Sequence, residues 1–149
     1  ADFIGDSYAT TLAEDEILTH VLVPRLPPGS GWSYVKFGML ERPTIGVGCV
    51  LILDDTKQGI REARLALGSV GPKPVRLPDA EKQLKGISLQ GEEFERAVKE
   101  AGSYAQEVSD PVNDLYGSVD YKRHLAKVLT ERAIRLARNR AIGRNLENA

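Results

Sequence analysis

The side chains that most often perform catalysis or bind metals are few and scattered in this chain. The single cysteine, Cys49, lies far in sequence from both histidines, His20 and His124, and neither histidine accompanies a pair of acids. A lone histidine on a strand or helix is more often a packing or surface residue than a ligand. The sequence has neither the spacing of a metal site nor a strained nucleophile turn. Local chemistry therefore predicts no catalytic residue and no metal ligand.

The glycines of residues 68–71 come nearest to a phosphate-binding loop. They follow a predicted strand, but they match neither the dinucleotide-binding pattern nor the Walker pattern. Pro72 and Pro74 come next, where a phosphate loop would lead directly into a helix. The segment is therefore a weak candidate for binding phosphate.

Composition indicates one compact globular domain. Its 149 residues are enough to bury a single core, and apolar and charged residues make up 42% and 28% of the chain. The chain has no apolar run long enough to span a bilayer and no recognisable leader, and one cysteine suits a reducing compartment, so we expect a cytoplasmic protein. Because the sequence opens on Ala1-Asp2-Phe3, we expect it to be part of a longer polypeptide.

Charge is distributed unevenly along a chain whose net charge is −1. From Lys122 onward eight basic residues face two acidic ones, whereas the rest of the chain has 12 basic and 19 acidic residues. A basic helix suits nucleic acid or an acidic partner surface. No base-reading motif or aromatic platform accompanies this one, so we interpret it as a solvated helix face and expect no nucleic-acid partner.

The first half of the chain has the period of two that is typical of strands. We predict strands over residues 17–23, 32–40, 45–53 and 60–67, joined by short connections that favour an antiparallel meander. The strand at 45–53 is apolar on both faces and is predicted to be central, with close backbone approach at Gly46 and Gly48. In the strand at 60–67, Ala63, Leu65 and Leu67 are predicted to point inward. In the strand at 32–40, alternation places Trp32, Tyr34 and Lys36 on one face and Val35, Phe37 and Met39 on the other.

The second half changes to helical spacing. A short helix is predicted after Pro74, ending at Gly86, followed by a helix over residues 92–108 and a long helix with Ser118 as its N-cap. The fold class is therefore α+β: a three- to four-stranded antiparallel sheet followed by three helices packed on one face. We divide the single domain, residues 1–149, into a linker (1–15), a β-meander (16–75) and a helical layer (76–149).

Three separated blocks carry a family resemblance: DPVNDLYGSVDYKRHLAKVLTERA (110–133), LALGSVGPKPVRL (65–77) and ADFIGDSYATTLAEDEIL (1–18). In this order they resemble the C-terminal domain of the flavoprotein (medium) subunit of molybdenum hydroxylases, the enzymes of the carbon monoxide dehydrogenase and xanthine dehydrogenase type. The resemblance implies the same α+β layout. It also implies that residues 1–15 link this domain to an N-terminal half that holds the phosphates of FAD.

The resemblance implies a function within an oxidoreductase of several subunits. The domain is expected to cover FAD and to help electron transfer from a 2Fe–2S centre to FAD and on to an acceptor. Molybdopterin and 2Fe–2S are expected on a large and a small partner subunit, and the chain alone is not expected to be active. By the resemblance, Ile17 and Leu18 lie against the flavin and Lys36 lies close to its ring system, where a cation favours the anionic reduced form.

Two alternatives remain open from the sequence. The first is this flavin-covering role, and the second is an α+β interaction or assembly domain that keeps the fold without binding flavin. Lys36 is also explained as an ordinary exposed strand residue. For Asp114, Tyr121 and Arg123 we expect a role in organising the loop and the helix start, or contact with a neighbouring domain, rather than catalysis.

Overall fold

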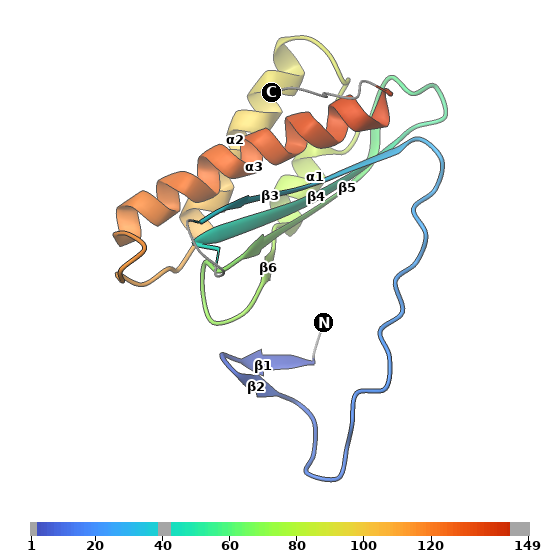
Figure 1. Ribbon diagram of the computed structural model, residues 1–149. Helices are drawn as coiled ribbons and strands as arrows, with labels where there is room; N and C mark the ends of the chain where they lie inside the picture. The colour runs from blue at the N-terminus through green and yellow to red at the C-terminus, as the bar shows by residue number, and fades with distance from the viewer. Residues whose placement is uncertain (1–2, 39–42, 144–149) are drawn as a thin grey trace.

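The computed structural model describes residues 3–38 and 43–143, which form two layers (Figure 1). One layer is an antiparallel sheet with the strand order β3-β4-β5-β6, and the helices of the described residues cover one of its faces. This arrangement confirms the predicted α+β class. The elements are β1 (Ile4–Asp6), β2 (Ala9–Thr10), β3 (Ser30–Phe37), β4 (Ile45–Leu53), β5 (Ile60–Gly68), β6 (Val75–Arg76), α1 (Pro78–Leu84), α2 (Glu92–Val108) and α3 (Val119–Ala141).

The central strand is β4, as its apolar run predicted. It pairs with β3 and β5 on its two sides, and most of its residues are buried. On β5, Ala63, Leu65 and Leu67 are buried and face the helices, which confirms their predicted direction. The connection between β4 and β5 is the expected turn, in which the Asp54 side chain accepts a hydrogen bond from the backbone N–H of Gln58 (3.1 Å).

The helices begin and end close to where their capping residues predict. The second helix has the predicted bounds, and Ser118 caps α3 by accepting a hydrogen bond from the backbone N–H of Tyr121 (3.2 Å). Gly86, just after α1, has a φ of 84°, a backbone conformation that favours glycine. Helices α2 and α3 pack side by side on the sheet, and Phe94 of α2 is one of the largest fully buried side chains (Figure 1).

The prediction of a strand over residues 17–23 is wrong. These residues form no strand in the described part of the chain, and they belong to an extended segment that leads from β2 to β3 along one side of the molecule (Figure 1). Alternating apolar residues predict a strand, but a strand forms only where a neighbour supplies backbone partners. Conversely, the small hairpin β1–β2 lies within the predicted linker, and the two-residue strand β6 is too short to show a period.

The end of the predicted strand at residues 32–40 is only partly described. Met39 and Leu40 lie outside the described residues, and β3 ends at Phe37. Within β3, Trp32, Tyr34 and Lys36 are exposed, whereas Gly31 and Ser33 are buried against the helices. The alternation predicted for this strand is therefore confirmed over the residues that the structure describes.

The closest approach between the two layers is where α3 crosses the start of β3. A Cβ atom placed on Gly31 would lie 2.0 Å from the carbonyl oxygen of Ala137 and 2.4 Å from the backbone nitrogen of Ala141. Two residues later, the buried Ser33 hydroxyl donates a hydrogen bond to the Ala133 carbonyl (2.7 Å). Backbone therefore packs directly on backbone, and only glycine fits at position 31.

Gly31→Ala should lower the free energy of unfolding by about 3 kcal/mol, because the added methyl group meets backbone atoms that move only if α3 shifts. Urea unfolding followed by circular dichroism measures this change. Gly48→Ala is the matched control, since its Cβ would meet only Tyr34 at 3.9 Å, an ordinary contact. That control should change the free energy by less than about 1 kcal/mol. Equal losses in the two variants would contradict the close crossing.

Candidate functional site

The face of the sheet opposite the helices carries the exposed side chains of β3. Trp32, Tyr34 and Lys36 project from this uncovered face, and their cross-strand partners on β4 are Val50, Gly48 and Gly46. Gly46 in turn pairs with Gly68 on β5. Two aromatic rings and one ammonium group therefore border a patch of sheet that carries almost no side chains of its own.

The glycines of this patch make room for the Tyr34 ring. A Cβ atom on Gly46 would lie 2.5 Å from the Tyr34 hydroxyl oxygen, and one on Gly48 would lie 3.9 Å from Cδ2 of the ring. The phenol thus extends across β4 over the two glycines. The close backbone approach predicted at both glycines is therefore wrong: a side chain, that of Tyr34, comes close to Gly46, and the contact at Gly48 is an ordinary one.

A groove of about 490 Å³ lies beside Trp32 on the same sheet. Its walls include Arg64 and Arg76 from the sheet and Pro24 from the end of the extended segment. Both arginines are paired, Arg64 with Glu62 (2.6 Å) and Arg76 with Glu81 (2.7 Å). The groove is therefore apolar and aromatic at its centre and has neutralised ion pairs at its rim.

Trp32 is held in place from the helical layer. The Arg140 guanidinium lies 5.1 Å from the centre of the Trp32 ring and donates a hydrogen bond to the Trp32 carbonyl (2.8 Å). The cation–π contact and the hydrogen bond together fix the position of Trp32 at the start of β3.

The three residues predicted to contact flavin are not brought together in this structure. Lys36 lies on the uncovered face near the end of β3. Ile17 and Leu18 lie in the extended segment with 81% and 49% of their surface exposed. In Figure 1 this segment joins β3 at its start and descends away from the end at which β3 finishes. The flavin contacts of all three residues stay a prediction.

A second cluster surrounds the buried ammonium of Lys122 at the start of α3. Only 4% of Lys122 is exposed, and its Nζ atom donates to the Val112 carbonyl (2.7 Å) and pairs with Asp114 Oδ1 (2.7 Å). The same Asp114 oxygen accepts the backbone N–H of Tyr116 (2.8 Å). The hydrogen bond from Lys122 is the main reason that the pKa of Asp114 lies below its usual range, and the bond from Tyr116 adds to it.

The expected organising role of Asp114, Tyr121 and Arg123 is confirmed by these contacts. Arg123 Nε donates to the Ser109 carbonyl (3.1 Å), and the Tyr121 ring packs edge-on against Phe37 of β3, with ring centres 6.3 Å apart. Sequence reasoning missed Lys122. Its signal was available, because Lys122 lies four residues before the buried Ala126 and so falls on the apolar stripe of α3.

A polar cavity of about 430 Å³ adjoins this cluster. Its lining includes four residues that carry a hydroxyl group (Tyr8, Thr44, Ser69 and Tyr116), together with Asp114 and Lys122. The hairpin that carries Tyr8 is linked to the loop before β6 by a hydrogen bond from the Ser7 hydroxyl to the Pro72 carbonyl (3.3 Å). The cavity therefore lies at the same end of the sheet as Lys36, since Thr44 and Ser69 flank the paired glycines Gly46 and Gly68.

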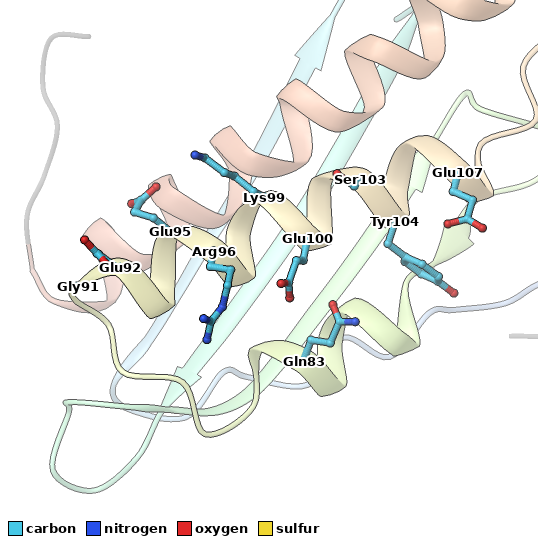
Figure 2. A pocket seen from close by; sticks show the side chains of 10 residues that line it. All are labelled: Gln83, Gly91, Glu92, Glu95, Arg96, Lys99, Glu100, Ser103, Tyr104 and Glu107. Atoms are coloured by element: carbon cyan, nitrogen blue, oxygen red, sulfur yellow. The ribbon is translucent and has the colours of Figure 1, made fainter.

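A hollow of about 810 Å³ lies on the outer surface of α2 beside α1. Figure 2 shows that the side chains around it spread outward along α2 and do not converge on one point. Most are charged, and Glu95 among them pairs with Arg135 of α3 (2.8 Å), whose hydrogen bond lowers the pKa of that carboxyl. This surface has the chemistry of a solvated helix face and is not the candidate site.

The geometry supports neither a metal site nor a reactive thiol among the described residues. Over residues 3–38 and 43–143 no group of three or more potential metal-binding side chains comes together. Burial raises the pKa of the Cys49 thiol, which keeps it protonated and unreactive. Among the helices of these residues, none has the length and apolar character to cross a membrane.

Comparison with known proteins gives matches to one protein family and to medium subunits of known enzymes. The family described as "CO dehydrogenase flavoprotein C-terminal domain" matches residues 41–137. The carbon monoxide dehydrogenase medium chain of Hydrogenophaga pseudoflava is 30% identical over 135 residues, which are 91% of this chain and 45% of that protein. The nicotine 6-hydroxylase medium subunit of Paenarthrobacter nicotinovorans is 34% identical over 132 residues, 89% of this chain and 44% of that subunit.

Solved structures give the same result. A carbon monoxide dehydrogenase structure from Hydrogenophaga pseudoflava superposes with a TM-score of 0.82 at 30% identity, covering 91% of this chain and 46% of that one. The fold and the sequence thus define a domain of the medium-subunit type. This chain belongs to the CO dehydrogenase flavoprotein C-terminal domain family. It spans about half the length of the curated relatives that it matches.

The Asp114–Lys122 pair makes a prediction about pH. Because the folded-state pKa of Asp114 is lowered, its carboxylate stabilises the fold above the ordinary pKa of about 4, and that stabilisation is lost as the pH falls through the folded pKa. Asp114→Asn should therefore lower the melting temperature at pH 7. The difference from the unaltered chain should shrink between about pH 5 and pH 2.

Thermal unfolding followed by circular dichroism over this pH range measures the effect. Asp110→Asn, in the same loop, is the control, since Asp110 forms no ion pair within the described residues. It should show a small difference that does not depend on pH. A difference for Asp114→Asn that stays constant down to pH 2 would rule out the carboxylate as the source of the stabilisation.

Proposed function

We propose that this chain is the C-terminal domain of the FAD-binding medium subunit of a molybdenum-dependent hydroxylase, where it covers FAD and helps electron transfer. Membership of the flavoprotein C-terminal domain family is the observation that carries the proposal. The relatives named above are medium chains or medium subunits of carbon monoxide dehydrogenase and nicotine 6-hydroxylase. The whole enzyme would be an oxidoreductase of several subunits, and this domain alone would be inactive.

The uncovered face of the sheet fits a flat redox ring better than it fits a whole dinucleotide. Tyr34 offers an aromatic surface that lies over Gly46, Gly68 beside it has no side chain, and Lys36 supplies a cation. The glycines after β5 do not form a phosphate cradle, because Gly68 ends the strand and the chain continues into β6, with no helix N-terminus at this point. The FAD phosphates would therefore be held by the additional half that the longer relatives have.

Bound FAD would supply the capacity to take up two electrons and pass them on. The part of this chain is to shape the surroundings of the ring. Ile17 and Leu18 would exclude water from it by apolar contact, and the Lys36 ammonium would favour the negatively charged reduced form. No residue of the chain is assigned a catalytic step.

The partners follow from the proposed place of the domain. They are a large subunit with molybdopterin, which would select the substrate, a small subunit with 2Fe–2S, and the FAD-binding half of the same subunit. The assembly is proposed to be cytoplasmic. The second candidate, an assembly domain without a flavin role, is favoured by one observation, namely that Ile17 and Leu18 are exposed in the extended segment whereas Lys36 belongs to the sheet.

The 149-residue chain on its own should bind FAD weakly or not at all. One wall of apolar and aromatic residues cannot replace the phosphate contacts that anchor a dinucleotide. After incubation with FAD and desalting, the absorbance of oxidised flavin should be lost from the protein fraction. Stoichiometric flavin that stays with the chain would show that the binding site is complete without the other half.

Lys36→Met tests whether this lysine tunes the flavin in the full-length subunit. The substitution keeps most of the aliphatic stem and removes the charge, so the free energy of unfolding should change by less than about 0.5 kcal/mol. The flavin potential should fall by tens of millivolts, since a nearby charge pair is worth about 1 kcal/mol or more. Redox titration of the flavin absorbance measures the potential.

Lys85→Met is the matched control, because Lys85 is an exposed lysine that follows α1 in the helical layer. The flavin potential of the Lys85→Met subunit should equal that of the unaltered subunit. If Lys36→Met is folded and flavin-loaded but leaves the potential unchanged, Lys36 is an ordinary surface residue and the assembly-domain alternative gains support.

A further inference from the structure

Residues 17–23, ILTHVLV, form an exposed apolar segment that we call the apolar arm. Its side chains at alternate positions are Ile17, Thr19, Val21 and Val23, all β-branched, with Leu18 and Leu22 between them. Every residue of the arm is exposed in the structure. β-Branched residues in alternation are typical of a strand. Five of the seven side chains are apolar and exposed, interrupted by Thr19 and His20, and an exposed apolar segment of this kind marks an interaction site.

The backbone of the arm is equally unsatisfied. Among the described residues, no backbone hydrogen bond involves residues 17–23, although the chain there is extended. An extended backbone with free N–H and C=O groups is the form in which a segment adds to the edge of a sheet. The arm therefore lacks both an apolar cover and a ladder of backbone partners, and a single neighbouring strand would supply both.

Contacts on either side keep the arm away from the domain's own sheet. Before it, the β1–β2 hairpin bonds to the loop before β6 through Ser7 and Pro72 (3.3 Å). After it, Pro24 and Leu26 line the groove beside Trp32, as does Val23, the last residue of the arm. Between these two points the chain follows a long curved path outside the sheet (Figure 1).

We propose that the apolar arm is an edge strand of a sheet in the preceding half of the medium subunit, added to that sheet by backbone pairing. The inference rests on the proposed function, because it takes the additional length of the relatives, of which this chain covers about 45%, to be that half. The arm then belongs structurally to the neighbouring unit, and the domain proper begins at β3. This division differs from the meander expected over residues 16–75.

A second copy of the chain is the less suitable occupant. The long free edge that a copy offers is that of β3, where Arg140 already occupies the Trp32 carbonyl (2.8 Å). The other outer strand, β6, has two residues.

The arrangement accounts for the separation of the predicted flavin contacts. Ile17 and Leu18 open the arm, whereas Lys36 stands on the uncovered sheet face. If the FAD-binding half sits between arm and sheet, the two groups approach its cofactor from different sides. Ile17 and Leu18 would then contact the cofactor from one side and Lys36 from the other, without contact between them.

Hydrogen–deuterium exchange in the full-length subunit and in the 149-residue chain tests the proposal. In the chain alone, the amides of residues 17–23 should exchange as fast as those of an unfolded peptide. In the full-length subunit, alternate amides of the arm should exchange about 100-fold more slowly. The amides of β4, paired on both sides, should be protected in both proteins and serve as the internal reference.

Fast exchange of the arm in the full-length subunit would overturn the proposal. So would protection of the arm in the chain alone that rises with protein concentration, since a second copy would then be the occupant. Flavin content separates this result from the proposed function. A flavin-loaded subunit with an unprotected arm refutes only the arm's pairing, and a flavin-free subunit with a protected arm refutes only the flavin role.

A matched pair of substitutions tests the side chains of the arm. Val21 is 72% exposed and Val112, in the loop before α3, is 71% exposed. In the full-length subunit Val21→Ser should reduce the protection of the arm about tenfold or more, whereas Val112→Ser should leave it unchanged. In the chain alone both variants should behave like the unaltered protein. Equal effects of the two substitutions in the full-length subunit would overturn the proposal.

Discussion

The contact between α3 and the start of β3 is the constraint on which the rest of the structure depends. Gly31 allows the backbone of α3 to rest on the backbone of β3, and the Ser33 hydroxyl bonds to a carbonyl of the same helix. Such a short separation permits no intervening side chain at that point. The long helix is therefore fixed in direction across β3 and β4, and α2 packs beside it on the same face.

The helices of the described residues lie on one face of the sheet, so the other face is open to a binding partner. The core closes between β4, β5 and the helices without using Trp32, Tyr34 or Lys36. Their exposure therefore removes no apolar contact from the core. The glycines of β4 allow the Tyr34 side chain to lie across the strand. An open, aromatic and cationic sheet face beside an unpaired apolar arm suits a domain that completes a larger subunit.

The start of α3 shows how a buried charge can organise a loop. Removing the Lys122 ammonium from water is costly, and the cost is offset because Asp114 and the Val112 carbonyl both bind it. These bonds fold residues 109–118 over the helix start, where Asn113 accepts the backbone N–H of Val119 (2.8 Å). Tyr121 then packs on Phe37, so that the loop, the helix and the end of β3 are joined.

The sequence by itself determined the elements whose signal is local. Strand β4 followed from an uninterrupted apolar run, α2 from its period, and the start of α3 from Ser118, because in each case the deciding interactions lie within a few residues. The uncovered face of β3 also followed, since alternation assigns the two sides of a strand. Family resemblance then indicated Lys36, which does lie on that face.

Only the tertiary structure decided which features pair across long distances. Neither the closeness of Gly31 to Ala137 nor the partner of Lys122 has a local signature, since each depends on where a distant element comes to rest. The arm makes the same point in reverse. Its alternation correctly expressed a preference for extended backbone, but a strand needs a neighbour, and residues 3–38 and 43–143 offer the arm none. Periodicity sets what a segment is able to form, and the presence of a partner sets whether it forms.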